Sequence, residues 1–420
     1  MLLADIDLAS PDFFVPAPPH EALRVLRDHD PVHWQSEPPP NHGFWAVTKY
    51  NDLEAVMRDP VNFSAEKAGV ILEEMAPDEL QARQSMMETD PPRHTRLRKI
   101  VSPLFTPRAV KEYEIYCREL ARAMLDKALA EREFDFVEEI SRQLPIRVLA
   151  RILGVPYEDT DKLIEWGDRM IGNADPEYAD LVVGRDDTSQ YRLLPFRSPA
   201  AAELCEYGHA MADRRRHDPR SDLVSKLVHA EVDSQSLTTV EFDNFFSLLV
   251  VAGNETTRHS ITHGMLALMD HPDEMHRLAA DPALIPRAVE EMLRWGSVTM
   301  QFRRTASRDT EIRDVPIREG DKVVVYFISA NYDDEVFVDP FRFDITRDPN
   351  PHVAFGSGGP HFCLGNALAR LEINVLFEEL TKRVTRIESL GDLSRLRSNF
   401  IAGIKHLPVR FTDVREPASV

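Results

Sequence analysis

A glycine-rich loop that leads one cysteine into a helix constrains this chain more than any other stretch. It runs from Phe355 through Gly358 and Gly359 to Cys363. Glycine takes turn conformations that other residues avoid and lets the backbone approach a flat ligand closely, so the loop is shaped before a ligand binds. Apolar residues recur at helical spacing after Cys363, which places the cysteine at a helix N-terminus. Free N–H groups and the helix dipole favour a thiolate there.

A single cysteine is most often a small buried hydrophobe, and its residue type alone leaves that interpretation open for Cys363. A structural zinc site needs about four ligands, and neither Cys117 nor Cys205 has a second cysteine or a ligand-spaced histidine beside it. The Cys-x-x-Cys-His pattern of covalently attached haem is also absent. A single thiolate in a glycine loop suits haem, because the porphyrin fills four positions of the iron and the protein supplies one axial ligand.

The composition excludes several classes of protein. With 420 residues, of which 43% are hydrophobic and 29% charged, the chain can bury a large core. A formal charge of -20 argues against nucleic acid as a partner, because binding phosphates needs a basic face. Three cysteines cannot form a disulfide framework in a chain of this size, and no signal segment or apolar run of about 20 residues is present. We therefore expect a cytoplasmic protein without a membrane span.

The chain shows no internal division. No glycine/serine linker, low-complexity tract or repeat is present, so we expect one domain over residues 1–420. Residues 1–45 are rich in proline and predict an extended N-terminal arm, interrupted by a short amphipathic segment at 21–28. Strand-like runs at 44–48 and 322–327 predict a small β-rich lobe on an otherwise helical body.

Two polar residues interrupt the longest predicted helix. This helix begins at a capping box formed by Thr238 and Glu241 and ends before a proline, which gives it a length of about 45 Å. Glu255 and Thr256 lie in its apolar middle. Polar groups there are costly unless they are hydrogen-bonded, so they predict a wet pocket. The alternative is purely structural, with the threonine bonded to a backbone carbonyl and Glu255 paired with Arg258.

A third stretch carries basic residues on one face of a helix. A helix start after Asp90 places His94 and Arg98 one turn apart. A haem carries two propionates, for which such side chains are suitable partners when buried. Taken alone, the stretch is more typical of a solvated basic helix face.

Together these stretches resemble the haem-thiolate monooxygenases of the cytochrome P-450 family, of the soluble bacterial type. The resemblance covers about 90–380 and rests on four motifs in the family's order, from the His94 helix to the Cys363 loop. It implies a mainly α fold: a single large helical domain with a smaller β-rich lobe, and haem b (iron protoporphyrin IX) between the long central helix and the cysteine loop. One departure is visible, because Phe355 stands eight residues before Cys363 and the family's commonest bacterial pattern has seven.

The resemblance also implies roles for individual residues. Cys363 would be the iron ligand, and Glu255 with Thr256 would be catalytic by relaying protons while oxygen is activated. Other haem contacts would come from four stretches of the chain, namely His94, Arg98, Ala252, Gly253, Arg304, Phe355 and His361. Glu291, Arg294 and Arg342 would form a structural network.

We therefore predict a monooxygenase that inserts one oxygen atom of dioxygen into a hydrophobic small molecule of the steroid, terpenoid or lipid class. No flavin, nicotinamide or iron–sulfur motif is present, so two electrons must come from outside. We expect a ferredoxin-type donor with its reductase, docking near Arg96 and Lys99, and we expect a monomer. The alternatives are a peroxide-driven haem-thiolate oxygenase and a non-catalytic haem-thiolate sensor.

The substrate pocket is expected to be mostly apolar. The candidate lining residues are Val70, Ile71, Leu72, Phe246, Leu249, Val298, Met300 and Ile401. The glycine–proline variant of the cysteine loop is similar to that of some steroid and branched-lipid hydroxylases.

Overall fold

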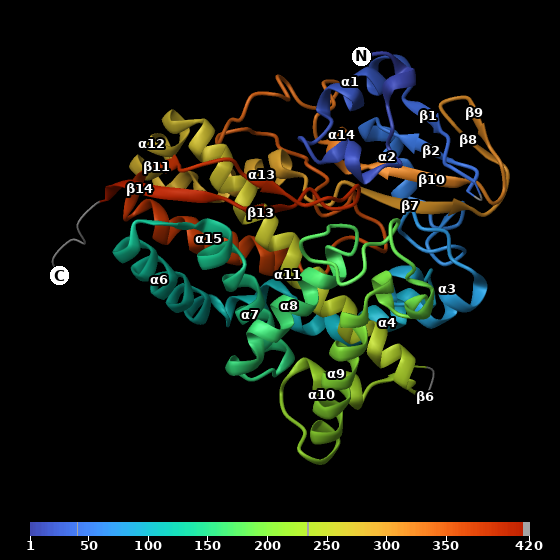
Figure 1. Ribbon diagram of the computed structural model, residues 1–420, viewed down its shortest axis with the longest axis horizontal. Coiled ribbons are helices and arrows are strands. Elements are labelled where there is room, and N and C mark those ends of the chain that lie inside the picture. The colour runs from blue at the N-terminus through green and yellow to red at the C-terminus, as the bar shows by residue number, and fades with distance from the viewer. Residues whose placement is uncertain (40, 233–234, 415–420) are drawn as a thin grey trace.

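The computed structural model describes residues 1–39, 41–232 and 235–414. It combines a body of packed helices with a lobe built around a five-stranded sheet, which lies at the upper right of Figure 1. The mainly α fold with a smaller β-rich lobe is therefore confirmed.

Helices supply most of the ordered structure. In the described ranges the α-helices are α1 (His20–His29), α2 (Tyr50–Arg58), α3 (Pro77–Arg83), α4 (Arg93–Val101), α5 (Pro107–Lys111), α6 (Glu114–Glu131), α7 (Gln143–Leu153), α8 (Thr160–Ile171), α9 (Pro199–His217), α10 (Leu223–Val228), α11 (Thr239–Asp270), α12 (Pro272–Ala280), α13 (Ile285–Gly296), α14 (Phe327–Ala330) and α15 (Asn366–Thr381). None of the helices in these ranges has both the length and the apolar character needed to cross a bilayer.

The strands form one main sheet and several smaller ones. They are β1 (Val32–Gln35), β2 (Phe44–Val47), β3 (Phe63–Ser64), β4 (Glu133–Asp135), β5 (Glu231–Val232), β6 (Gln235–Ser236), β7 (Gln301–Ala306), β8 (Thr310–Ile312), β9 (Val315–Ile317), β10 (Lys322–Tyr326), β11 (Val384–Ser389), β12 (Ser394–Arg395), β13 (Ile404–His406) and β14 (Pro408–Val414). The main sheet has the order β1-β2-β10-β7-β3, and a three-stranded sheet has the order β11-β14-β4.

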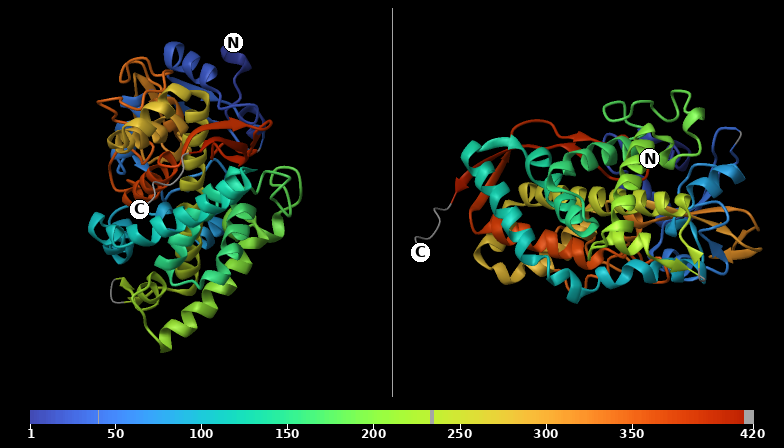
Figure 2. Two further views of the ribbon diagram at one scale, coloured as in Figure 1. Left: turned by 90° about the vertical axis from the view of Figure 1, so that its left-hand side faces the viewer. Right: turned by 90° about the horizontal axis from the view of Figure 1, so that it is seen from below.

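The helix α11 runs through the middle of the body, as the right-hand view of Figure 2 shows in yellow-green. It begins at the predicted capping box of Thr238 and Glu241 and contacts α7, α8, α9 and α13. Glycine allows one close crossing, because a Cβ at Gly253 would lie 3.0 Å from the Leu149 side chain of α7. Neighbours from four helices hold the middle of α11 in a fixed position.

The β-rich lobe forms from the two strand-like runs that the sequence singles out. β2 and β10 pair as parallel strands, with Val323 opposite Trp45, and β7 pairs antiparallel with β10 on its other side. β10 is buried along its whole length, which explains its run of valines.

The N-terminal segment is more folded than its prolines predict. α1 contains the predicted amphipathic segment, but the residues before it are not an extended arm. Ile6, Leu8 and Phe14 are buried in a cluster with residues of the main sheet, and the Leu8 N–H donates to the Gln35 side chain at 3.0 Å. Three apolar side chains therefore fold this segment onto the sheet.

A buried ion-pair network joins α13 to the loops that follow β10. Arg294 donates two hydrogen bonds of 2.8 Å to Glu291, and both side chains are fully buried. Arg347 also donates to Glu291, at 3.1 and 3.2 Å. Here the structure corrects the prediction, because the Arg342 side chain is 65% exposed and comes no nearer than 4.0 Å to a carboxylate. The stretch around Arg342 contributes its backbone instead, since the Pro340 carbonyl accepts from Arg294.

Replacing Glu291 with glutamine is expected to destabilise the protein by about 3–5 kcal/mol, because Arg294 and Arg347 would keep buried positive charge without its counter-charge. Arg342→Ala is the matched control. It is expected to change the free energy of unfolding by about 0.5 kcal/mol or less, since that side chain is exposed. Urea unfolding measures the free energy of unfolding of both variants. Equal destabilisation by the two substitutions would contradict the finding that Arg347, and not Arg342, belongs to this network.

Candidate functional site

A cavity lies between the middle of α11 and the cysteine loop. Its wall includes Ala252, Gly253 and Thr256 on the α11 side and Phe355 and Cys363 on the loop side. Basic residues from α4, β7 and the loop complete it, namely His94, Arg98, Arg304 and His361. The structure thus gathers around one cavity all the residues for which the sequence predicts haem contacts.

The cysteine loop is pinned against the end of α2. Gly358 and Gly359 have φ angles of 94° and 73°, which favour glycine, and a Cβ on Gly359 would lie 2.8 Å from the Met57 carbonyl oxygen. Arg58 donates to the Ser357 carbonyl at 2.8 Å. The loop therefore has its shape independently of a ligand.

Backbone hydrogen bonds hold the sulfur of Cys363. Its N–H donates to the Phe355 carbonyl at 2.9 Å, and the N–H groups of Gly365 and Asn366, at the start of α15, donate to the sulfur. Burial raises the pKa of the thiol, while these donors and the nearby Arg98 oppose the rise. The described residues contain no group of three or more His, Cys, Asp or Glu that could bind a metal ion. A metal at Cys363 would therefore need its other ligands from a cofactor.

Glu290 fastens the cysteine helix to α13. Its carboxylate accepts two hydrogen bonds from Arg370 of α15, at 2.6 and 2.9 Å, and lies 2.9 Å from Nε2 of His352. The Arg370 guanidinium in turn lies 4.5 Å from the centre of the Phe355 ring. Burial alone would raise the pKa of Glu290, but the hydrogen bonds from His352 and Arg370 outweigh burial and lower it to about 2. One carboxylate thus holds the residues on both sides of the loop.

Four basic side chains gather at one edge of the cavity. The His94 and His361 rings lie 4.2 Å apart between centroids. Arg98 donates to two loop carbonyls at 2.6 and 3.3 Å, and the buried Arg304 donates to the Arg303 carbonyl at 2.7 Å. Burial lowers the pKa of His94 to about 4, of His361 to about 2 and of Arg304 to about 10. These groups are therefore desolvated without a full counter-charge.

This cluster fits a flat cofactor that carries two carboxylates. Within the described part of the chain, Nδ1 of His94 and Nε2 of His361 are buried and have no hydrogen-bond partner. Buried polar atoms are rarely left unpaired, so two such nitrogens beside two arginines indicate an anionic ligand. Haem offers two propionates together with an iron that needs an axial ligand, which Cys363 can supply.

Thr256 lies where the first cavity meets a second one and lines both. Its hydroxyl donates to the Ala252 carbonyl at 2.9 Å, which is the backbone bond of the structural alternative. Because the hydroxyl hydrogen is used in this bond, the oxygen presents its lone pairs to other partners.

Glu255 belongs to a buried cluster of charges. Its carboxylate lies 3.1 Å from Nη2 of Arg258 and accepts from Asn254 at 2.9 Å. Arg258 also pairs with Asp168 of α8, which pairs with Arg142. Burial raises the pKa of Glu255, although Arg258 and Arg142 oppose the rise. The pairing with Arg258 that the sequence leaves open is therefore present, and the carboxyl also lines the second cavity.

The second cavity is mostly apolar and shares a wall with the first. Of the residues predicted to contact substrate, five line one cavity or both: Val70, Ile71, Leu249, Val298 and Ile401. The other three lie elsewhere. Phe246 packs against Gly208 of α9, and Leu72 and Met300 belong to the cluster beneath the N-terminal segment. Several polar lining residues, Glu88 and Asn244 among them, are not apparent from the sequence.

Ion pairs hold two irregular segments together over the second cavity. Glu73 pairs with Arg83 at 2.7 Å and also with Arg197, and Phe196 next to Arg197 lines the cavity. A further pair joins Asp78 and Arg192 at 2.6 Å. The irregular connection at 172–199 is thus tied to the stretch around α3.

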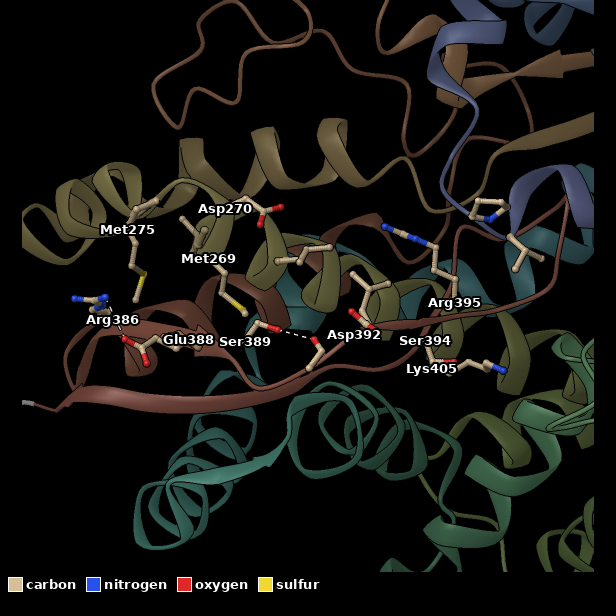
Figure 3. Close-up of a pocket in the computed structure, with 18 of the residues that line it drawn as sticks. Met269, Asp270, Met275, Arg386, Glu388, Ser389, Asp392, Ser394, Arg395 and Lys405 are labelled. Carbon is tan, nitrogen blue, oxygen red and sulfur yellow. Dashed lines mark hydrogen bonds and ion pairs between the residues drawn. The ribbon is translucent and has the colours of Figure 1, made fainter.

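A wide groove elsewhere on the molecule lacks this chemistry. Figure 3 shows it between the end of α11, α12 and β11, with charged residues on its walls. Several of these are already paired, such as Arg397 with Asp12 and Lys405 with Asp175. None of the predicted site residues is among the described residues that line the groove.

Comparison with known proteins gives a consistent result. The chain matches the cytochrome P-450 family model over residues 38–384. It is 38% identical over 418 residues to the steroid C26-monooxygenase of Mycobacterium tuberculosis, covering 97% of this chain and 92% of that protein. It is 39% identical over 421 residues to a methyl-branched lipid omega-hydroxylase of the same species, covering 98% and 95%.

A solved structure agrees with these relatives. A Mycobacterium marinum cytochrome P-450 in complex with pseudoionone superimposes with a TM-score of 0.88 at 38% sequence identity. The match covers 97% of this chain and 98% of that one.

The carboxylate of Glu290 is expected to make stability depend on pH. Its pKa is about 2 in the folded chain and 4.5 ordinarily, so its contribution is complete above about pH 5 and is lost as pH falls through 4.5 toward 2. Because the side chain is 30% exposed, we expect roughly 1–3 kcal/mol after solvent screening. Urea unfolding of Glu290→Gln and wild type between pH 7 and 3 measures this. The difference in free energy of unfolding between wild type and Glu290→Gln should shrink as the solution becomes more acidic. Glu319→Gln, at an exposed ion pair, is the control.

Proposed function

Because this chain belongs to the cytochrome P-450 family and is therefore a haem-dependent monooxygenase, we propose that it hydroxylates a hydrophobic small molecule of the steroid, terpenoid or lipid class. The apolar second cavity, which shares a wall with the cavity at Cys363, carries this proposal. The relatives support it, since two are named for a steroid and a methyl-branched lipid and the Mycobacterium marinum protein is bound to pseudoionone.

The residues around the first cavity would hold the haem. Cys363 would ligate the haem iron through its sulfur, and the N–H groups of Gly365 and Asn366 would stabilise the negative charge of that sulfur. His94, His361 and the two nearby arginines would hold the propionates, which would give the unpaired histidine nitrogens their partners. When bound, the haem supplies the redox chemistry that places one oxygen atom of dioxygen in a C–H bond. Ala252 and Gly253 form the wall opposite the cysteine.

Glu255 and Thr256 would manage protons at that wall. The lone pairs of the Thr256 hydroxyl are directed away from its bond to Ala252, so it accepts a hydrogen bond from a protonated group in the cavity. Burial raises the pKa of Glu255, which lets the carboxyl hold a proton and release it through water. Its pairing with Arg258 favours the ionised carboxylate and therefore promotes this release.

The electron donor would be a ferredoxin-type protein that docks beside the cysteine loop. The side chain of Arg98 reaches the loop carbonyls from α4, so the outer face of α4, with the exposed Lys99, lies next to the loop. An acidic protein is attracted to such a face, and the attraction weakens as salt increases.

A reconstituted assay tests the proposed activity. With a ferredoxin, its reductase and dioxygen, the holoprotein is expected to add one oxygen atom to at least one of three probes: cholest-4-en-3-one, pseudoionone or phytanic acid. Thr256→Ala should lower the product formed per electron pair by about 10- to 100-fold, because general acid–base groups contribute at least that much. Mass spectrometry of products made under labelled dioxygen provides the measurement.

Controls separate the alternatives. Wild-type turnover with peroxide alone that is undiminished in Thr256→Ala would favour a peroxide-driven oxygenase. Substrate binding without product, with any donor, would favour a non-catalytic sensor. Cys363→Ala should lose the thiolate type of carbon monoxide spectrum, and an unchanged spectrum would refute the axial ligand.

Lys99→Glu, which reverses the charge of this side chain, is expected to slow reduction of the haem by ferredoxin about 3- to 10-fold at low salt, because charge steers the encounter of the two proteins. The effect should fade at high salt. Stopped-flow measurement of haem reduction records it. Lys162→Glu on α8 is the matched control, and an equal effect of both substitutions would argue against docking at α4.

A further inference from the structure

The second cavity has a polar end of its own, made of residues that do not line the first cavity. Arg83, Ser85, Glu88 and Asn244 line the second cavity alone, whereas Val70, Leu248 and other apolar residues are common to both. A few polar groups in a mostly apolar cavity are what fixes the orientation of a ligand. These residues therefore bear on how a substrate lies relative to Cys363.

Asn244, at the polar end, lies far along α11 from Thr256. Asn244, Leu248, Ala252 and Thr256 follow one another at intervals of four residues and all line the second cavity, so they form one stripe of the helix. Twelve residues separate Asn244 from Thr256, which corresponds to about 18 Å along the helix axis. A ligand that touches both ends must be elongated.

Asn244 offers an acceptor at this end. Its side-chain NH₂ group donates to the carbonyls of Ala82 and Gln84 at 2.8 and 3.2 Å. Both donor hydrogens are therefore used to hold the stretch before Glu88 against α11. Within the part of the chain that the structure describes, the Oδ1 atom keeps its capacity to accept.

Glu88 offers a donor. Its Oε2 atom accepts from the Ser85 N–H at 3.0 Å and from the Ser85 hydroxyl, so neither of these bonds uses Oε1. Burial raises the pKa of this carboxyl, and the residue lines the second cavity. The protonated form therefore has a hydrogen available to a ligand. Arg83 opposes this rise in pKa, although its guanidinium is bound twice to Glu73.

We propose that Glu88 and Asn244 bind a hydroxyl or carbonyl oxygen of the substrate, at the end of an elongated apolar molecule remote from the carbon that is oxidised. A hydroxyl both donates and accepts, and a carbonyl accepts from Glu88, so either oxygen is matched by this pair. The inference rests on the proposed function and narrows it: the substrate is oxygenated at one end before this enzyme acts on the other.

Matched ligand pairs test the inference on the holoprotein. Cholestan-3-one and cholestane differ by one oxygen on a rigid skeleton, and phytanol and phytane differ by one oxygen on a branched chain. The shift of the haem spectrum on binding measures each affinity. Wild type should favour the oxygenated member of at least one pair by about tenfold, the value of one satisfied hydrogen bond. Glu88→Leu should reduce that ratio to about 1, and Glu88→Gln, which keeps a donor, should retain most of it.

Two further measurements make the outcomes distinct. Met87→Leu, an apolar exchange at the neighbouring lining position, should leave the ratio unchanged. Products of the favoured oxygenated ligand should carry the new hydroxyl at the far end in wild type and at scattered positions in Glu88→Leu. An unaltered ratio in Glu88→Leu, or an equal loss of affinity for both members of a pair, would overturn the inference. If lipophilic compounds are oxidised but the oxygenated member is favoured in neither pair, this inference alone fails. If no lipophilic compound is oxidised, the proposed function itself fails.

Discussion

The haem site that we propose depends on the negative charge of one sulfur atom, that of Cys363. Burial opposes that charge, and the chain counters it with two N–H groups at the start of α15 and with the nearby Arg98. Such small electrostatic gains act only if the geometry is fixed. The loop is therefore held from two directions, by Arg58 of α2 on one side and by Glu290 of α13 on the other.

The sequence predicts those parts of the site that local rules determine. Positive φ angles at Gly358 and Gly359 require glycine, and the capping box at Thr238 sets the start of α11. The valines of β10 and the start of α15 follow from spacing in the same way. The four motifs of the resemblance then suffice to place their residues around one cavity, because each motif belongs to one rigid element.

Residues whose partners come from distant loops could not be predicted in this way. Arg347 and Arg342 both follow α13 by about fifty residues, and only the path of the loop decides which of them turns inward. For Phe246, helix geometry could have corrected the prediction. Phe246 and Leu248 are two residues apart on α11, which corresponds to a rotation of about 200°, so Phe246 points away from the cavity that Leu248 lines. Glu88 and Glu290 have no such signal, since an acid on a helix is usually exposed and these two are covered by segments far away in sequence.

The middle of α11 shows that the structural and the functional interpretation of polar residues are compatible. Thr256 bonds to a carbonyl of its own helix, and because that bond uses its hydrogen, the oxygen is left as an acceptor facing both cavities. Glu255 is paired with Arg258, and because Asp168 and Arg142 belong to the same cluster, the carboxyl can take up or release a proton while opposite charges remain close by. The contacts that make these polar residues tolerable in a buried helix are therefore compatible with the proton transfer that we propose for them.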